Sequence, residues 1–243
     1  MELAHTTLIR NLREHSRLTD EDVDQITKLS SVVRQYEPDE DLIRQGDTPK
    51  AAALVLSGMV GRYHLLGDGR RQYLSFHIVG DMPDAQGLFI DQMDHAVCAM
   101  GRSVIAFIPH SDIVRAFKVR PSLGFAIWRE TLIDAAIFRE AVTNNSARSV
   151  LARMAHLFCE LYYRARVSGV VRQSSLALPL SLVQLGEALG MAIATVNRTL
   201  LQLRASGSAD FRDGTLTVKN WEKLAEIGEF DPRYLHVKKT PPL

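Results

Sequence analysis

Residues 180–218 constrain the fold of this chain more than any other segment. Ser181 can cap a short helix, and Gly190 follows it at a turn where a positive φ favours glycine. A second helix begins near Ile193, with apolar residues at the 3.6-residue period of one face. An Asp-Gly pair then predicts a β-hairpin over 211–218. We therefore expect a winged helix-turn-helix, which reads double-stranded DNA; the plainer alternative is a helical hairpin inside a core.

The second helix of this motif should carry the side chains that face DNA, because a recognition helix places its first turn in the major groove. Arg198 can form paired hydrogen bonds to guanine O6 and N7, whereas Asn197 either contacts adenine or serves the local backbone. Ser181 and Thr195 suit phosphate, and Arg212 should lie near the tip of the wing. The predicted DNA-binding residues are Ser181, Ala192, Ala194, Thr195, Asn197, Arg198, Gln202 and Arg212.

The N-terminal part of the sequence is helical at first and then rich in β-strand patterns. Residues 1–30 have the apolar spacing of helices, and Thr19 can cap a helix with an acidic first turn. From residue 31 to 121, short β-rich runs are separated by glycine-containing turns at intervals of roughly a dozen residues. We expect an antiparallel, jelly-roll-like β-roll there.

A long helix is predicted over residues 122–145. Its middle is apolar around the whole circumference except at Asp134, so it has to be buried on more than one side. The β-roll on one side and a second copy of the chain on the other would satisfy this; an internal core helix of a monomer is the alternative. A further amphipathic helix is expected over 147–167, followed by a loop over 168–175.

These elements predict an α+β chain with four regions: an N-terminal helical segment (1–30), a β-roll effector domain (31–121), a dimerisation helix (122–145) and a winged helix-turn-helix domain (146–243). The net charge is only +1, but it is unevenly distributed. Residues 1–145 carry 16 basic and 20 acidic side chains, whereas the remainder carries 13 and 8. The positive excess of the last region favours contact with phosphate.

The composition disfavours several classes of protein. No apolar run approaches the roughly 20 residues of a membrane span, so we expect a cytoplasmic protein without a membrane partner. The two cysteines, Cys98 and Cys159, form no CxxC motif, so neither a disulfide framework nor a cysteine metal cluster is expected. No GxSxG, P-loop or HExxH motif occurs, and we expect no enzymatic activity.

With these features, the chain resembles the Crp/Fnr superfamily of bacterial transcription regulators over nearly its whole length. The motifs that carry the resemblance are LIRQGD near 42–47, LVLSGMV at 54–60, GDMPDAQGLF at 80–89 and LVQLGEALGMAIATVNRTLLQLR at 182–204. The VNRTL sequence is most similar to an α-proteobacterial branch. The resemblance implies a homodimer on a pseudo-palindromic operator, with RNA polymerase as a candidate partner and an effector site in the β-roll.

The sequence departs from the cyclic-AMP-responsive members at the residues that hold the nucleotide. Those members place a Glu shortly before a Gly-Leu-Phe stretch and an Arg-Ser pair a few residues later. Here Ala85 stands at the Glu position, and His95-Ala96 stands at the Arg-Ser positions. Without the carboxylate for ribose and the guanidinium for phosphate, cyclic AMP is not the expected effector, and no cofactor is expected. The candidate pocket residues are Gly80, Asp81, Ala85, Gly87, Leu88, His95 and Ala96.

The recognition helix and the N-terminal region also differ from those of known relatives. Classical members begin the recognition helix with Arg-Glu, whereas this chain has Ile193-Ala194 and keeps Arg198. The operator should therefore keep a guanine read by Arg198 and differ beside it. No cysteine precedes Cys98, so an iron–sulfur oxygen sensor is not expected.

Several effector chemistries remain open. The histidines in or beside the β-roll, His64, His77, His95 and His110, show no HxH or HxxxH spacing, so isolated structural histidines are favoured over a metal site. Protonated His95 could bind an anionic ligand, and Cys98 could be a redox handle or a buried structural thiol. A vestigial pocket, with control by abundance alone, is a further alternative. Another is a small-molecule-binding regulatory module with a degenerate DNA domain that acts through protein contacts.

Overall fold

The computed structural model describes residues 2–238; Met1 and residues 239–243, which belong to the first and last expected domains, lie outside the described residues. The N-terminal segment consists of two helices, α1 (Glu2–His15) and α2 (Asp20–Thr27). Thr19 caps α2, because its Oγ1 accepts the Asp22 backbone N–H at 3.2 Å and the Asp22 carboxylate accepts the Thr19 N–H at 3.0 Å. The predicted cap is confirmed.

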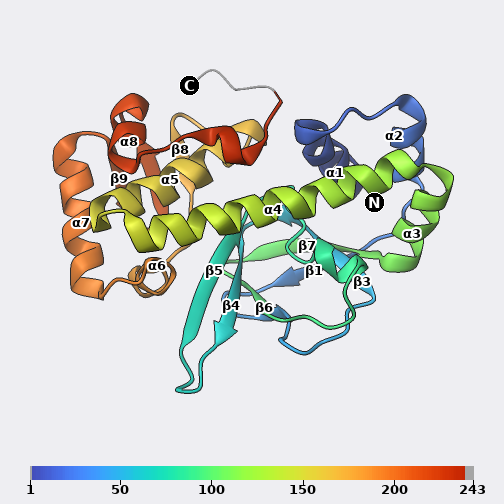
Figure 1. Ribbon diagram of the computed structural model, residues 1–243, viewed down its shortest axis with the longest axis horizontal. Coiled ribbons are helices and arrows are strands. Elements are labelled where there is room, and N and C mark those ends of the chain that lie inside the picture. The colour runs from blue at the N-terminus through green and yellow to red at the C-terminus, as the bar shows by residue number, and fades with distance from the viewer. Residues whose placement is uncertain (1, 239–243) are drawn as a thin grey trace.

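An antiparallel β-roll follows these helices, as the sequence predicted (Figure 1). Its elements are β1 (Val32–Tyr36), β2 (Asp41–Ile43), β3 (Ala51–Ser57), β4 (Val60–Leu65), β5 (Arg71–His77), the 3-10 helix η1 (Ala85–Leu88), β6 (Ala96–Ala99) and β7 (Ser103–Pro109). One sheet has the order β1-β7-β3 and the other β2-β6-β4-β5. Gly58 joins β3 to β4 with φ +83°, and a Cβ at this position would lie 2.6 Å from the Arg102 carbonyl oxygen. This turn therefore requires glycine.

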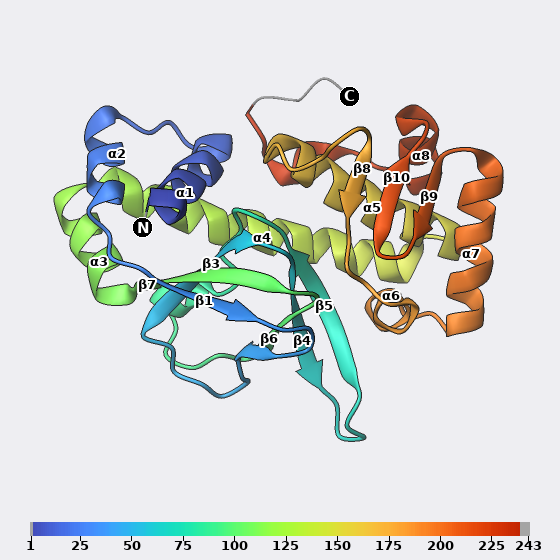
Figure 2. The ribbon, with the colours of Figure 1, turned by 180° about the vertical axis from the view of Figure 1, so that it is seen from behind.

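The long helix α4 (Pro121–Ala147) lies across the β-roll and reaches the C-terminal part of the chain (Figure 1, Figure 2). The helix α3 (His110–Val119), which the sequence analysis did not predict, connects β7 to it. One side of α4 is buried, whereas Phe125, Trp128, Leu132 and Val142 are each at least 50% exposed. The exposed side shows the alternating three- and four-residue spacing of a coiled-coil seam, and we call this set the seam: Phe125, Trp128, Leu132, Ala135, Arg139 and Val142. The seam shows that α4 is not an internal core helix of a monomer.

None of the helices between residues 2 and 238 has the length and apolar character of a membrane span.

The C-terminal part of the chain, which we define as residues 150–235, contains the predicted helix-turn-helix and wing. Its elements are α5 (Val150–Val167), β8 (Ser175–Ala177), α6 (Leu182–Leu189), α7 (Ile193–Ser206), β9 (Ala209–Arg212), β10 (Thr215–Val218), α8 (Trp221–Gly228) and the 3-10 helix η2 (Pro232–Leu235). The predicted hairpin turns at Asp213 and Gly214, which both have positive φ. The strand β8 pairs with β10, so the wing is a three-stranded sheet, and the segment expected as a loop ends in a strand.

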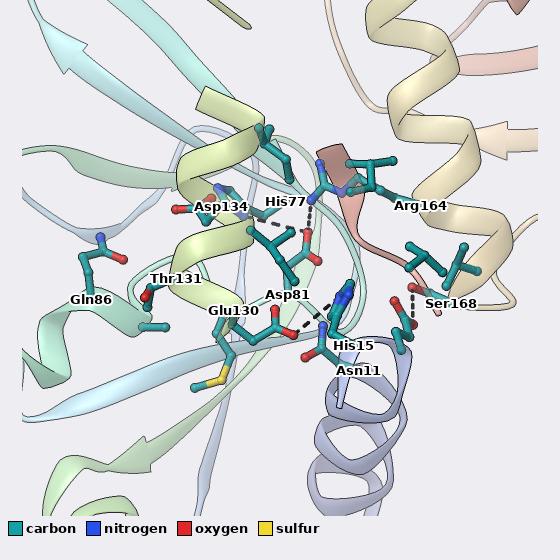
Figure 3. A pocket seen from close by; sticks show the side chains of 18 residues that line it. Asn11, His15, His77, Asp81, Gln86, Glu130, Thr131, Asp134, Arg164 and Ser168 are labelled. Carbon is teal, nitrogen blue, oxygen red and sulfur yellow. Dashed lines mark hydrogen bonds and ion pairs between the residues drawn. The ribbon is translucent and has the colours of Figure 1, made fainter. Parts of the chain in front are cut away.

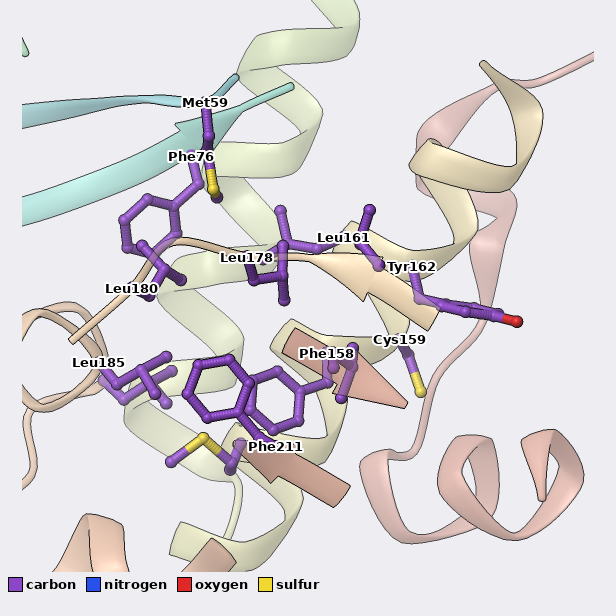
Figure 4. Close-up of a cluster of buried hydrophobic side chains, with 14 of the residues drawn as sticks. Met59, Phe76, Phe158, Cys159, Leu161, Tyr162, Leu178, Leu180, Leu185 and Phe211 are labelled. Atoms are coloured by element: carbon purple, nitrogen blue, oxygen red, sulfur yellow. The ribbon is translucent and has the colours of Figure 1, made fainter. Parts of the chain in front are cut away.

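One apolar core extends from the β-roll into the C-terminal part (Figure 4). Met59 and Phe76 of the roll lie in the same buried cluster as Phe158 of α5 and as Leu178 and Leu180, which precede α6. Two smaller clusters lie within the roll and between the roll, α1 and α4. The roll and the C-terminal part therefore bury apolar surface against each other.

We expect the substitution Phe158→Ala to lower the free energy of unfolding by about 3 to 5 kcal/mol, because it leaves a cavity in the shared core. Chemical denaturation measures this change. Phe89→Ala is the matched control: Phe89 is 54% exposed, and its truncation should change the unfolding free energy much less. Equal losses in both variants would contradict the assignment of Phe158 to the core.

Candidate nucleic-acid interface and effector cleft

The helix-turn-helix is held by local contacts that the sequence largely predicted. The Ser181 Oγ accepts the Gln184 backbone N–H at 3.2 Å, and the Gln184 Oε1 accepts the Ser181 N–H at 2.8 Å, so both caps of α6 are satisfied. Gly190 ends α6 with φ +64° in the left-handed conformation, as expected. Ser181 therefore caps a helix in this structure, and its hydroxyl is already engaged.

Gly186 is a structural residue of the turn that the sequence analysis missed. A Cβ at Gly186 would lie 2.6 Å from the Met191 carbonyl oxygen, and the Met191 N–H donates to the Gly186 carbonyl at 2.8 Å. A side chain there would push the two helices apart. The signal was a glycine inside a helix, four residues before the turn glycine Gly190.

The recognition helix α7 buries one face and exposes the opposite one. Val196, Leu200 and Leu203 are buried as predicted, but Ile193 is 48% exposed, so its assignment to the inner face was wrong. Ile193 is the first residue of the helix and lies beyond the edge of the core that the later turns contact. Thr195, a predicted DNA-binding residue, is partly buried. Five other predicted DNA-binding residues on this helix and its N-cap are exposed: Ala192, Ala194, Asn197, Arg198 and Gln202.

Arg198 and Asn197 differ in how far the chain itself engages them. The Asn197 Nδ2 donates to the Ile193 carbonyl at 3.2 Å, which is the local backbone role that the sequence left open. The Arg198 side chain forms no hydrogen bond or ion pair with any residue in the described range. Its guanidinium is therefore the group on α7 that is free to pair with an external acceptor.

The wing presents Arg212 to solvent at the end of β9. Its Nε lies 3.2 Å from an Asp210 oxygen, and the side chain is 61% exposed. The other Asp210 oxygen accepts from the Arg204 Nε at 2.8 Å, so Asp210 ties the wing to the last turn of α7. The recognition helix α7 and the wing therefore lie next to each other in the C-terminal part (Figure 2).

A cleft of about 420 Å³ lies between the β-roll and α4, and an ion pair crosses it. The Arg62 side chain, from β4, is only 2% exposed; its Nη1 donates to the Asp134 Oδ2 at 2.5 Å, and its Nε donates to the Pro83 carbonyl at 2.7 Å. Gln86 accepts a longer hydrogen bond from the same guanidinium, 3.4 Å. The cation of this cleft is therefore neutralised within the chain, by a carboxylate of α4.

The predicted pocket residues are mostly not in this cleft. Of the seven, only His95 lines it, and the sequence analysis missed Arg62, Gln86 and Asp134. Asp81 and Ala85 line a separate, narrow cavity between α1, α4 and α5, and Ala96 is buried. The remaining three lie in or beside the segment that includes η1 and take part in its packing: Gly80, Gly87 and Leu88.

The surroundings of His95 do not favour the hypothesis that its protonated form binds an anion. Burial lowers the pKa of His95, and the nearby Arg62 charge lowers it further, against the opposing effect of Asp94. Its Nδ1 lies 2.7 Å from the Asp94 Oδ1, and its Nε2 lies 3.3 Å from the Gln86 amide nitrogen. Below neutral pH, protonation would add a positive charge beside an existing guanidinium, which is unfavourable.

The other candidate chemistries find little support within residues 2–238. In this range no group of three or more His, Cys, Asp or Glu side chains is arranged to hold a metal ion. Cys98 is fully buried, its Sγ lies 3.8 Å from the Tyr73 hydroxyl, and burial raises the pKa of its thiol to about 11. A protonated, inaccessible thiol is poorly reactive, so the structural interpretation of Cys98 is favoured over a redox role.

Comparisons with known proteins agree with both parts of the fold. Residues 33–119 match the family described as "Cyclic nucleotide-binding domain", and residues 152–227 match "Crp-like helix-turn-helix domain". The "Fumarate and nitrate reduction regulatory protein" of Vibrio cholerae is 21% identical over 210 residues, 86% of this chain and 84% of that protein. The "Transcriptional activator protein anr" of Pseudomonas aeruginosa is 23% identical over 190 residues, 78% of each chain.

Solved structures share the same fold. FixK2 from Bradyrhizobium japonicum superposes with a TM-score of 0.73 at 24% identity, covering 82% of this chain and 98% of FixK2. CLP from Xanthomonas campestris, described as a c-di-GMP responsive global regulator, superposes with a TM-score of 0.62 at 19% identity and covers 82% of this chain and 99% of CLP.

We expect Asp134→Ala to lower the free energy of unfolding by about 3 kcal/mol or more, because it leaves the buried Arg62 guanidinium without its counter-charge. Chemical denaturation measures the loss, and the double variant Arg62→Leu with Asp134→Leu should recover most of it. Asp68→Ala, which breaks the exposed Asp68–Arg70 pair, is the control and should lower the free energy of unfolding far less than Asp134→Ala does. An Asp134→Ala variant as stable as this control would contradict a buried, structural ion pair.

Proposed function

The chain belongs to the Crp/Fnr family of transcription regulators, and on this basis we propose that it binds a pseudo-palindromic operator as a homodimer. The observation that carries the proposal is Arg198, a solvent-exposed guanidinium on the outer face of α7 that has no hydrogen-bond or ion-pair partner among residues 2–238. The inner face of α7 is buried, so the helix can offer only the Arg198 side to the major groove.

The remaining proposed contacts with DNA follow from this orientation of α7. Ala192 and Ala194 are small and exposed, so the α7 backbone can approach the bases closely, and Gln202 lies one turn beyond Arg198. Thr195 and Arg212 suit the phosphates on either side of the groove. We expect guanine opposite Arg198 and no requirement for a cytosine read by a glutamate, because the helix begins with Ile193 and Ala194.

The seam supplies the surface for a two-fold dimer. Residues at one heptad position of two parallel helices face each other, so the aromatic and aliphatic side chains of the seam would be covered by their counterparts. A C2 dimer would place two recognition helices roughly 34 Å apart, one turn of DNA. We further propose the division into an N-terminal helical segment, a β-roll, a dimerisation helix and a DNA-binding domain that the sequence suggested.

The charges of the cleft argue against cyclic AMP as the effector. The Arg62 cation is already paired with Asp134, and Asp94 adds a carboxylate at the same cleft. A ligand phosphate would have to displace Asp134 and approach a second negative charge. We therefore propose a transcription regulator whose β-roll is not a cyclic AMP sensor, in the cytoplasm and with RNA polymerase as its downstream partner.

We expect Arg198→Ala to weaken binding to a DNA site selected from a random library by about 5- to 150-fold, the loss of one bidentate base contact. Gel-shift titration over several salt concentrations measures this affinity. Arg115→Ala on α3, whose side chain is 67% exposed and lies in the N-terminal part, is the control and should bind like the unmodified protein. Weak binding to every sequence, unchanged by Arg198→Ala, would contradict sequence-specific recognition and favour a degenerate DNA domain.

We expect Leu132→Glu to dissociate the dimer, because it places two carboxylates opposite each other in an apolar seam. Sedimentation equilibrium should give the mass of two chains for the unmodified protein and 27.2 kDa for the variant. Leu65→Glu on β4, also an exposed leucine but outside the seam, should remain dimeric. A dimeric Leu132→Glu variant would place the interface elsewhere.

A further inference from the structure

A narrow cavity lies where α1, α4, α5 and the loop after β5 meet, next to the effector cleft, with which it shares Gln86, Thr131 and Asp134 (Figure 3). Its volume is about 50 Å³, enough for a few water molecules but not for an effector of drug or nucleotide size. The cavity lies where the β-roll contacts the C-terminal part, since Asp81 belongs to the former and Arg164 to the latter. Any charge that appears here acts on the packing of the two parts.

Arg164 of α5 holds this junction together. Its Nη2 lies 2.5 Å from the Asp81 carboxylate, and its Nη1 donates to the Phe76 carbonyl at 3.2 Å and to the Glu160 Oε1 at 3.1 Å. The side chain is only 11% exposed. The Arg164 guanidinium is therefore already paired with two carboxylates and a backbone carbonyl.

Two further carboxyl groups line the same cavity without a basic partner. Glu14 at the end of α1 accepts the Ser168 Oγ hydrogen bond at 3.1 Å, and the Glu130 Oε1 of α4 lies 3.6 Å from the His15 Nε2. Among the described residues, no lysine or arginine lies within 4.0 Å of either carboxyl group. If both were ionised, they would add two negative charges beside Asp81 with only Arg164 nearby.

Unpaired acceptors also face this space. The Asn11 Oδ1 and the Glu130 Oε1 are buried and accept no hydrogen bond from the described residues, and Asn11 is 4% exposed. Both residues line the narrow cavity. A buried acceptor without a donor is unfavourable, and a proton on a neighbouring carboxyl group would supply one.

The electrostatics of the cavity favour the protonated acids. Burial and then the Asp81 charge raise the pKa of Glu14 to about 7, and burial, followed by Asp81 and Glu14, raises the pKa of Glu130 well above its usual range. Burial lowers the pKa of His15 to about 4, so His15 is neutral at physiological pH and supplies no counter-charge.

The charged and titratable groups around the two acids come from every element that packs on them. They are Arg10 and His15 of α1, Asp134 of α4, Glu160 and Arg164 of α5, His77 and Asp81 at and after the end of β5, and His236 of the C-terminal tail. Of the nearby arginines, Arg164 is already paired with Asp81 and Glu160, Arg62 is paired with Asp134, and Arg10 is not within ion-pair distance of either acid.

We propose that Glu14 and Glu130 form a proton-binding site that couples the packing of the C-terminal part on the β-roll, and thereby DNA binding, to pH near neutrality. The coupling to DNA rests on the proposed function. Loss of a proton from Glu14 places a second carboxylate beside Asp81, where it repels Asp81 and competes with it for Arg164. The contact between α1, α4 and α5 is then weakened.

The direction in which pH changes the stability of the fold follows from the linkage between proton binding and folding. A group that binds its proton more tightly in the folded than in the unfolded chain stabilises the fold in acid, and this contribution is lost as pH rises through the folded-state pKa. For Glu14 this window lies between its ordinary value of about 4.5 and about 7. The junction should therefore be tightest in mild acid and weaker above neutrality.

The first test is thermal unfolding of the full chain without DNA from pH 5 to pH 8.5. We expect the Tm of the unmodified protein to fall with rising pH more steeply than that of Glu14→Gln, which carries no titratable proton. Glu130→Gln should also flatten the curve, and it keeps the test decisive if Glu14→Gln folds poorly. Glu2→Gln, the same change at an exposed position of α1, should follow the unmodified protein. Parallel curves for all four proteins would overturn the proton site.

The second test measures affinity for a selected operator at pH 6 and pH 8. We expect at least a threefold change in Kd for the unmodified protein and for Glu2→Gln, and no such change for Glu14→Gln. A Tm effect without this change in affinity would overturn the coupling to DNA. The same measurement is repeated with choline in place of potassium in the buffer. If the pH effect then disappears, a bound metal cation rather than a proton neutralises the carboxylates, and the proton site is overturned. The unfolding test contains no DNA, so a failure to find any operator would contradict the proposed function and leave the proton site to be decided by unfolding.

Discussion

A helix that is apolar on most of its surface cannot remain uncovered in water, and α4 imposes this requirement on the whole chain. The helices α1, α3 and α5 and the 3-10 helices η1 and η2 contact it, and Arg62 of the β-roll pairs with Asp134 in its middle. Among residues 2–238, the seam is the side of α4 that remains exposed. The candidate effector cleft and the narrow acidic cavity are both lined on one side by this helix.

The features that could be predicted from the sequence are those that a few neighbouring residues determine. The Ser181 cap, the turn at Gly190 and the hairpin turn at Asp213-Gly214 each depend on a few neighbouring residues and were identified correctly, whereas the reciprocal capping role of Gln184 was not predicted. The first strand of the wing, β8, was missed because only three residues form it and its pairing with β10 spans about 40 positions. Ile193 matched the period of its helix but lies past the edge of the core.

The candidate DNA interface and effector cleft could be predicted only in part, because some of their residues come together only in the folded chain. Most of the predicted DNA-facing residues lie on the single helix α7 and its N-cap, so the helical period is enough to locate them. The cleft instead depends on Arg62 and Asp134, 72 positions apart, whose contact exists only once α4 lies on the roll. Each is visible in the sequence, Arg62 as an arginine within a strand and Asp134 as the acid in the apolar middle of the long helix, but the sequence does not show that the two residues pair. Motif comparison pointed to Ala85 and His95 because family members use those positions, and here the charges have moved elsewhere.

The apolar core that runs from Met59 and Phe76 into Leu178 and Leu180 has a consequence for engineering and for evolution. In regulators with this architecture, an engineer can design a chimaera that fuses the operator-recognising half of one protein to the sensor half of another. In this chain such a graft would leave both halves with exposed aliphatic and aromatic side chains, and it would aggregate unless the facing residues were transplanted with it. The recognition specificity of this lineage is therefore expected to change by substitutions on the outer face of α7, more readily than by exchange of the whole half.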